Sequence, residues 1–149
     1  MVAQINNHSV MIKSKIIILL LAGGLSACGQ FYQKHSHRKL TEMETTKISN
    51  KTVKAAIEAW QQGNSELWLS FFTEEAKLLD DGKIRNFKEF STKAIGPECF
   101  TSFEKVENNG LSVYGQFHSD TWGDFKTYFK FHINKEERIS QLEIGQAYY

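Results

Sequence analysis

The strongest constraint on the fold is a segment late in the chain in which apolar and polar side chains alternate. One set of alternate positions is apolar apart from one hydroxyl: Phe125, Thr127, Phe129, Phe131 and Ile133. The intervening positions are polar: Asp124, Lys126, Tyr128, Lys130 and His132. Because successive side chains of a β-strand point to opposite faces of the sheet, this pattern predicts a strand with one buried face and one face in water.

This segment is one of four that have the length and composition of β-strands. The four predicted strands are Glu98 to Val106, Leu111 to Ser119, Gly123 to Ile133 and Arg138 to Ala147. Turn-forming residues separate neighbours, at Asn109-Gly110 and again around residues 135–137. Strands joined by short turns predict an antiparallel meander.

The first part of the domain has the period of helices instead. Apolar side chains at helical spacing occupy Val53, Ala56, Ile57 and Trp60. Ser65 is placed to cap a second helix, and Asn86 with Glu89 form a capping pair for a third. Between them we expect a short strand, Lys77 to Asp80, before the Asp81-Gly82 turn. Helices followed by a long meander predict an α+β fold, in which an aromatic-rich antiparallel sheet curves around about three N-terminal helices.

Composition excludes several classes of protein. The chain has 149 residues, 41% of them hydrophobic, which suits one globular domain. Its 18 Lys and Arg residues are balanced by 17 Asp and Glu residues, so no basic surplus favours nucleic acid. No phosphate-binding loop, dinucleotide motif or metal-spaced Cys/His cluster occurs, so we predict no cofactor and no metal.

The N-terminal segment has the layout of a secretory signal. A short basic stretch beginning at Met11 precedes the aliphatic run Ile16 to Leu21, and Leu25-Ser26-Ala27-Cys28 follows. The last four residues resemble the lipobox of bacterial lipoproteins. This resemblance implies cleavage before Cys28, acylation of Cys28, and a lipid-anchored protein of the cell envelope, on the outer membrane facing the periplasm. Met11 is an alternative start to Met1, because it gives a more compact signal.

These features divide the chain into three parts. Residues 1–27 are the upstream segment and signal peptide, residues 28–49 are the lipidated cysteine and a polar tether, and residues 50–149 are the folded domain. Lipidation would consume the sulfur of Cys28 and leave Cys99 as the other cysteine. We therefore expect Cys99 to be a buried free thiol on a strand.

The domain resembles the nuclear transport factor 2-like superfamily, and SnoaL-like domains most closely in style. The residues that carry the resemblance are Trp60, Gly63-Asn64, Phe71 to Ala76, Asp80 to Gly82 and Lys135 to Leu142. The resemblance covers Lys51 to Tyr149 and implies a cone, a strongly bent sheet whose helices close one side of a pocket. The superfamily includes isomerases, cyclases, dehydratases and non-catalytic binding modules, so the fold alone does not select a function.

Ketosteroid isomerase, a relative within that superfamily, allows a residue-by-residue comparison. Its gap-free likeness to residues 55–76 puts Asp80 at the position of the general base. The same register puts Ala56 at the position of one oxyanion donor, and the last hairpin puts Phe129 at the position of the other. Both replacements lack a hydrogen-bond donor, so no catalytic residue is assigned. A turn residue is the alternative interpretation of Asp80.

We expect a pocket of apolar side chains with few polar groups, which is the usual composition of a ligand site. Its predicted lining is Trp60, Asp80, Phe125, Thr127, Phe129, Leu142, Ile144 and Gln146. Trp122, in a hairpin loop, is a candidate for contact with something outside the domain. No serine or cysteine is linked by spacing to His118 or His132, so a nucleophilic triad is not predicted.

Three functions remain open from the sequence. The first is a lipid-anchored, non-catalytic module that binds a small apolar molecule of unknown identity. The second is a SnoaL-like or isomerase-like enzyme that uses Asp80 as acid and base. The third is an envelope assembly module that dimerises or docks through the polar sheet face of Lys126, Tyr128, Lys130 and His132.

Overall fold

The computed structural model describes residues 45–149 of the chain. Three α-helices in this part are α3 (Lys51–Gln61), α4 (Ser65–Ser70) and α5 (Phe87–Ala94). The strands are β1 (Phe72–Asp80), β2 (Lys83–Arg85), β3 (Glu98–Glu107), β4 (Ser112–Ser119), β5 (Gly123–Ile133) and β6 (Ile139–Gln146). A short 3-10 turn, η2 (Asn108–Gly110), joins β3 to β4.

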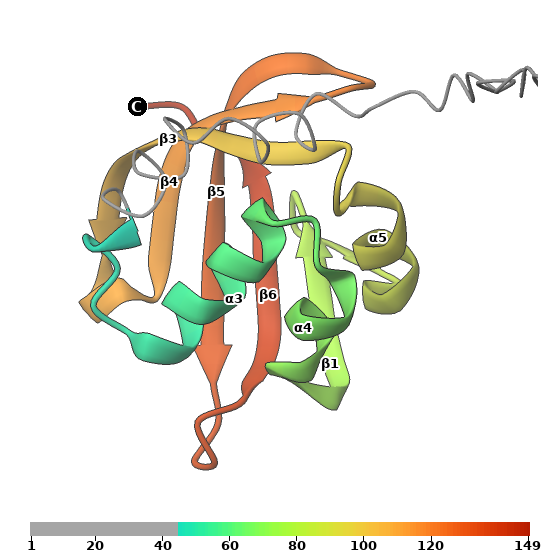
Figure 1. Cartoon of the computed structure of the whole chain (residues 1–149), viewed down its shortest axis with the longest axis vertical. Coiled ribbons are helices and arrows are strands. Elements are labelled where there is room, and N and C mark those ends of the chain that lie inside the picture. Colours follow the sequence, from blue (N-terminus) through green and yellow to red (C-terminus); the bar gives the residue numbers. More distant parts are fainter. Residues whose placement is uncertain (1–44) are drawn as a thin grey trace, which may run out of the picture.

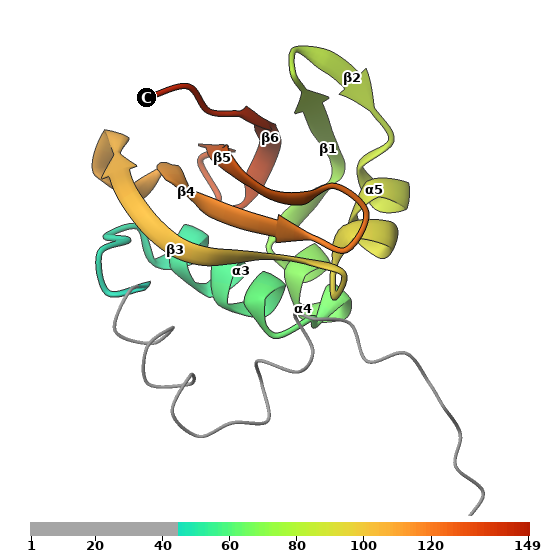
Figure 2. The same cartoon turned by 90° about the horizontal axis from the view of Figure 1, so that it is seen from above.

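The strands form a single six-stranded sheet in the order β2-β1-β6-β5-β4-β3. All neighbours are antiparallel except β1 and β6, which run parallel. The sheet is strongly curved, with α3 and α4 against one face and α5 beside β1 and β2 (Figures 1 and 2). The predicted α+β fold, with a curved sheet packed on about three helices, is confirmed.

The four strands of the meander lie within one or two residues of their predicted bounds. On β5 the predicted inward side chains Thr127, Phe129 and Phe131 are 3%, 1% and 3% exposed. His132, on the opposite face, is exposed. The alternation of side chains therefore predicted the correct register for this strand.

The region before the meander differs from the prediction in three places. Asn64, rather than Ser65, caps α4, because its side-chain oxygen accepts a hydrogen bond from the backbone N–H of Leu67 at 3.0 Å. Strand β1 starts at Phe72 rather than at Lys77, and it gains this length by pairing with β6. Strand β2 was not predicted; it pairs with β1 across the expected Asp81-Gly82 turn.

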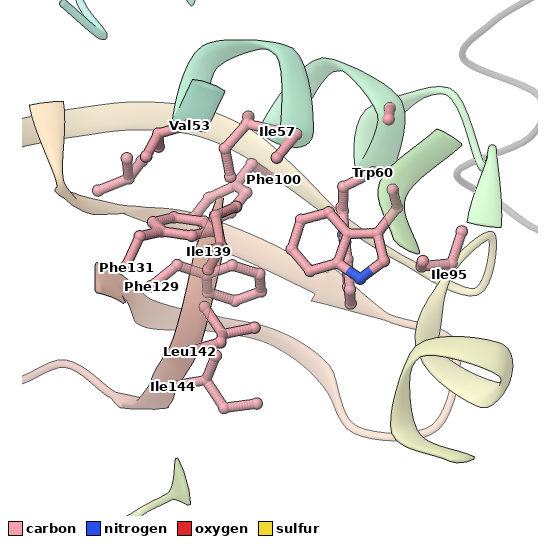
Figure 3. Packing of buried hydrophobic residues seen from close by; sticks show 14 of the residues in the cluster. Val53, Ile57, Trp60, Ile95, Phe100, Phe129, Phe131, Ile139, Leu142 and Ile144 are labelled. Carbon is pink, nitrogen blue, oxygen red and sulfur yellow. The ribbon is translucent and has the colours of Figure 1, made fainter. Parts of the chain in front are cut away.

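Aromatic and aliphatic side chains from the sheet and the helices form one core (Figure 3). Trp60 of α3 lies between the sheet and the other helices, with its ring centroid 5.3 Å from that of Phe129 and 4.9 Å from that of Trp68. The helices therefore cover the concave apolar face of the sheet, which leaves its opposite face to polar side chains.

The domain begins earlier than residue 50. Ile48 is buried in the core, and the Thr45 hydroxyl donates to Glu58 of α3 at 2.9 Å. Lys47 donates to the carbonyl of Phe103 at 3.2 Å. Residues 45–49, which the sequence placed in the tether, are thus packed onto the domain. Within residues 45–149 no helix is long and apolar enough to cross a membrane.

Cys99 corrects one expectation. It is buried, at 5% exposed, as predicted, but it takes part in a disulfide bond. Residues 45–149 contain no free cysteine. The prediction of a free thiol was wrong, because Cys99 is disulfide-bonded. Cys28 and the whole signal segment lie outside the described residues.

Candidate ligand-binding cavity

A cavity of about 460 Å³ opens at one end of the sheet. Strands β1 and β6 end there, and β3 and β5 begin there. Its lining comes from these strands, from β4 and α5, and from the turns that join strands. The lining residues are Asp80, Asp81, Phe90, Glu98, Phe117, Trp122, Phe125, Thr127, Phe129, Ile144, Gly145 and Gln146.

Most of the predicted pocket residues meet at this cavity. Those that line it are Asp80, Phe125, Thr127, Phe129, Ile144 and Gln146. Trp60 and Leu142 do not line it, which corrects the prediction. Trp60 is enclosed by aromatic rings in the layer behind the cavity, and Leu142 is buried where β6 pairs with β1 and β5.

The inner wall of the cavity is apolar and aromatic. Phe117 of β4 stands opposite Phe125 in the strand register, with ring centroids 5.7 Å apart. Its ring is also 5.6 Å from that of Phe129. Phe90 of α5 and Ile144 of β6 complete this wall. A ligand that covers this apolar surface excludes water from it, which favours binding by about 25 cal/mol for each Å² that is buried.

The mouth of the cavity carries carboxylates. Asp80 forms an ion pair with Arg85, with 3.2 Å between Oδ2 and the guanidinium nitrogen. Asp81 adopts a left-handed backbone conformation (φ 47°) in the turn, and its Oδ1 accepts a hydrogen bond from the backbone N–H of Gln146 at 3.2 Å. Asp81 thereby ties the β1–β2 turn to the end of β6 and fixes this side of the mouth.

Glu98 is the third carboxylate of the mouth and differs from the other two. It is partly buried, and its Oε1 accepts a hydrogen bond from the Ser119 hydroxyl at 3.0 Å. Burial raises the pKa of Glu98 above its ordinary value, and repulsion from Asp80 and Asp120 adds to this rise against the opposing Ser119 hydrogen bond. Among residues 45–149 no cationic side chain forms an ion pair with it.

Trp122 lies over the mouth in the β4–β5 turn and is 77% exposed. The Ser119 hydroxyl oxygen accepts backbone N–H bonds from Thr121 and Trp122, each at 3.3 Å, while it donates to Glu98. A single serine therefore connects the acidic group at the mouth to the turn that carries the indole.

The isomerase-type donors are absent at the positions that the resemblance predicts. Ala56 is completely buried in α3, and Phe129 presents an apolar ring to the cavity. The Trp60 indole N–H is a buried donor with no partner in the described part of the chain, and it lies in the layer behind the cavity.

The two histidines within residues 45–149 lie outside the cavity lining. His118 is bonded through Nδ1 to Asp124 at 2.6 Å and through Nε2 to Asp120 at 3.3 Å. Hydrogen bonding to Asp124, and less to Asp120, raises the pKa of His118, while burial opposes the rise. His132 pairs with Glu143 at 2.7 Å on the polar sheet face. No group of three or more His, Cys, Asp and Glu side chains within residues 45–149 is arranged to hold a metal.

Several lining residues were not predicted from the sequence. Phe117 could have been found, because the β4–β5 hairpin register sets it opposite Phe125. Glu98, Asp81 and Phe90 could not, because each reaches the cavity from a segment whose position depends on the curvature of the whole sheet.

The sequence itself matches no known protein-family model and no curated protein. The fold, however, is similar to that of solved structures. An NTF2-like protein of unknown function from Cytophaga hutchinsonii matches with a TM-score of 0.54 and 13% identity, over 66% of this chain and 89% of that one. An NTF2-like protein from Anabaena variabilis matches with a TM-score of 0.53 and 14% identity, over 71% and 91% of the two chains.

The Orange Carotenoid Protein of Anabaena (Nostoc), in a structure that binds canthaxanthin, matches with a TM-score of 0.53 and 15% identity. That match covers 65% of this chain but only 35% of that protein. At these identities the comparisons show a fold and no more. The fold of residues 45–149 is the NTF2-like cone.

Proposed function

We propose that this chain is a lipid-anchored protein of the bacterial cell envelope, whose NTF2-like domain holds a small, largely apolar molecule without transforming it. The observation that carries the binding role is the cavity of about 460 Å³, with its aromatic inner wall and its polar groups at the mouth. Drug-sized ligands occupy cavities of roughly 300–1,000 Å³ with this composition.

The structural neighbours support an apolar ligand. One of them, the Orange Carotenoid Protein, binds canthaxanthin, an apolar pigment, and 35% of that protein matches this chain. A carotenoid is longer than a cavity of this size, so a molecule of that class would insert one ring and leave the rest outside. Compact ring compounds would be enclosed more fully.

The non-catalytic part of the proposal depends on Ala56 and Phe129. Neither can donate a hydrogen bond to a developing oxyanion, and each lost donor typically costs about 3–4 kcal/mol of transition-state stabilisation. Asp80, the candidate base, is occupied by an ion pair with Arg85. These groups suit retention of a ligand better than proton transfer.

A direct test measures binding of N-phenyl-1-naphthylamine, a neutral probe that fluoresces in apolar surroundings, to the purified full chain. The variant Ile144→Phe adds volume to the inner wall and should abolish the fluorescence gain. The matched control is Ile84→Phe, the same change at an exposed position of β2 outside the lining. Equal binding by both variants, or no binding by the unmodified chain, would contradict a ligand-binding role for this cavity.

The anchor is proposed from the lipobox-like Leu25-Ser26-Ala27-Cys28 sequence. The disulfide bond of Cys99 conflicts with this anchor, because Cys28 is the other of the two cysteines in the sequence. A sulfur that carries a lipid thioether cannot also join a disulfide, so peptide mass spectrometry of the protein from bacterial envelopes is decisive. A Cys28 peptide with acyl chains would support the anchor, and a Cys28–Cys99 cross-linked peptide would overturn it. Fatty-acid labelling should disappear in Cys28→Ser and persist in the control Cys99→Ser.

A further inference from the structure

The charged side chains that line the cavity are all negative. Among residues 45–149 its lining includes the carboxylates of Asp80, Asp81 and Glu98 but no lysine, arginine or histidine. Arg85 reaches Asp80 with its guanidinium group, but Arg85 is mostly exposed and does not line the cavity. A ligand inside therefore meets negative charge at the mouth and aromatic carbon further in.

Of these three carboxylates, Glu98 has the weakest neutralisation of its negative charge by neighbouring groups. Asp80 has an arginine partner and Asp81 accepts a backbone N–H, whereas Glu98 accepts its hydrogen bond from the neutral Ser119 hydroxyl. Two other carboxylates, Asp80 and Asp120, repel it. A positive group in the mouth would relieve this repulsion and would restore part of the solvation that Glu98 loses by burial.

A second observation points to the same kind of ligand. Trp122 lines the same mouth with an indole that is 77% exposed, although large aromatic side chains are usually well covered. The electron-rich face of tryptophan is the best aromatic partner for an organic cation. Ser119 holds the indole-bearing turn and Glu98 through one hydroxyl group, so a carboxylate and a cation-binding ring are fixed at one opening.

A third observation concerns the inner end. The Trp60 N–H is buried without a partner in the described part of the chain, and the residue is 1% exposed. Its ring packs on Phe90, Phe117 and Phe129, all of which line the cavity. An unpaired buried donor costs about 1–3 kcal/mol, so the aromatic layer that supports the inner wall carries an unsatisfied polar group.

We propose that the cavity binds an organic cation, with a ring-shaped body against the inner aromatic wall and a protonated amine at the mouth between Glu98 and Trp122. This inference rests on the proposed ligand-binding function and specifies its ligand class. The same charges disfavour carboxylate-bearing molecules of equal size, because these would place a second negative group beside Glu98.

The test uses three probes that share one ring body and differ in charge. Naphthalene-2-methylamine is cationic at pH 7, naphthalene-2-methanol is neutral, and naphthalene-2-carboxylate is anionic. Calorimetric titration of the purified full chain at pH 7 should rank the amine on the order of tenfold tighter than the alcohol, and the carboxylate weakest.

Variants assign the preference to named groups. Glu98→Gln should reduce the amine affinity to near that of the alcohol and leave the alcohol affinity unchanged. The matched control is Glu104→Gln on the same strand, which also accepts a hydroxyl hydrogen bond but lies outside the cavity. Trp122→Leu keeps the mouth apolar and should reduce the amine affinity more than the alcohol affinity.

Each outcome decides one question. Binding of the alcohol with no preference for the amine, or equal binding of amine and carboxylate, would overturn the cation inference and leave the proposed binding function standing. Binding of none of the three probes would overturn the inference as well, while retained N-phenyl-1-naphthylamine binding would still support an apolar cavity. An amine preference that survives Glu98→Gln would also overturn the assignment.

Discussion

Trp60 and Trp68 meet edge to face in the core, with 4.9 Å between their ring centroids, yet only one indole N–H is satisfied there. Trp68 Nε1 donates to the Ser91 hydroxyl of α5 at 3.1 Å. Trp60 Nε1 has no partner in the described part of the chain. Since Ser91 and both indoles are buried, Ser91 is the group that allows Trp68 to be buried without an unpaired donor.

Ser91→Ala should therefore lower the free energy of unfolding by about 1–3 kcal/mol, because it leaves the Trp68 N–H unpaired in the core. Urea unfolding followed by tryptophan fluorescence measures this loss. The neighbouring Thr92→Ala is the control, since Thr92 is exposed and bonds only its own helix backbone. Equal losses in the two variants would show that the Trp68 bond adds nothing.

Phe129→Ala should cost about 3–5 kcal/mol, because it removes a buried ring from the junction of helices and sheet. In the native core this ring packs against the rings of Trp60, Phe100 and Phe117. The same urea assay compares it with His132→Ala, on the outer face of the same strand. A loss below about 1 kcal/mol would contradict the position of Phe129 at the centre of the core.

The sequence predicts the meander well because, in a strand with one buried face and one solvent-exposed face, the alternation of apolar and polar side chains shows which residues point toward the core. Phe125 to Ile133 is the clearest case, and the hairpin partner strand follows from it. The parallel pairing of β1 with β6 is not predictable in this way. It joins segments that are far apart in the sequence, and Phe72 and Leu78 are the buried side chains of β1, so no alternating pattern marks this strand.

The close approach of β3 to Gly115 is a second feature that the sequence does not predict. A Cβ at this position would collide with the carbonyl of Ser102, because a bulge in β3 brings the two backbones together. Nothing in the local pattern of β4 marks that approach.

The lining of the cavity is likewise predictable only in part. Phe125, Thr127 and Phe129 follow from alternation on one strand. Glu98 and Trp122 meet only because the ends of β3, β4 and β5 converge. Helix periodicity correctly predicts that Trp60 is buried, but it does not tell whether the ring lines the cavity or lies behind it.

A pH dependence follows from His118. Its pKa is raised in the folded protein, chiefly by the hydrogen bond to Asp124. A raised folded-state pKa stabilises the protein fully below the unfolded value of about 6.5, and this stabilisation is lost as the pH rises through the folded-state pKa. Asp124→Asn should lower the His118 pKa in an NMR titration of the ring proton and reduce the difference in stability between acidic and alkaline pH. An unchanged pKa of His118 in this variant would contradict the His118–Asp124 hydrogen bond. The control is Glu136→Gln in the exposed β5–β6 turn, which should leave the pKa of His118 unchanged.

Catalysis provides the sharpest test of the binding proposal. Abstraction of a proton beside a carbonyl leaves an oxyanion that needs fixed donors in a dry site. The predicted donor positions hold Ala56 and Phe129, and two missing donors at about 3 kcal/mol each would reduce the rate by roughly 10⁴-fold. We therefore expect no measurable isomerisation of a β,γ-unsaturated ketosteroid by the full chain, and we expect Asp80→Asn to alter stability or ligand affinity through its lost ion pair with Arg85. Glu98 and Gln146 line the cavity and the Trp60 N–H lies in the layer behind it, and each could replace a donor, so Glu98→Gln, Gln146→Leu and Trp60→Phe belong in the same assay. Turnover that requires Asp80 and falls in any of these variants would establish an enzyme with a differently built oxyanion site and would end the non-catalytic interpretation.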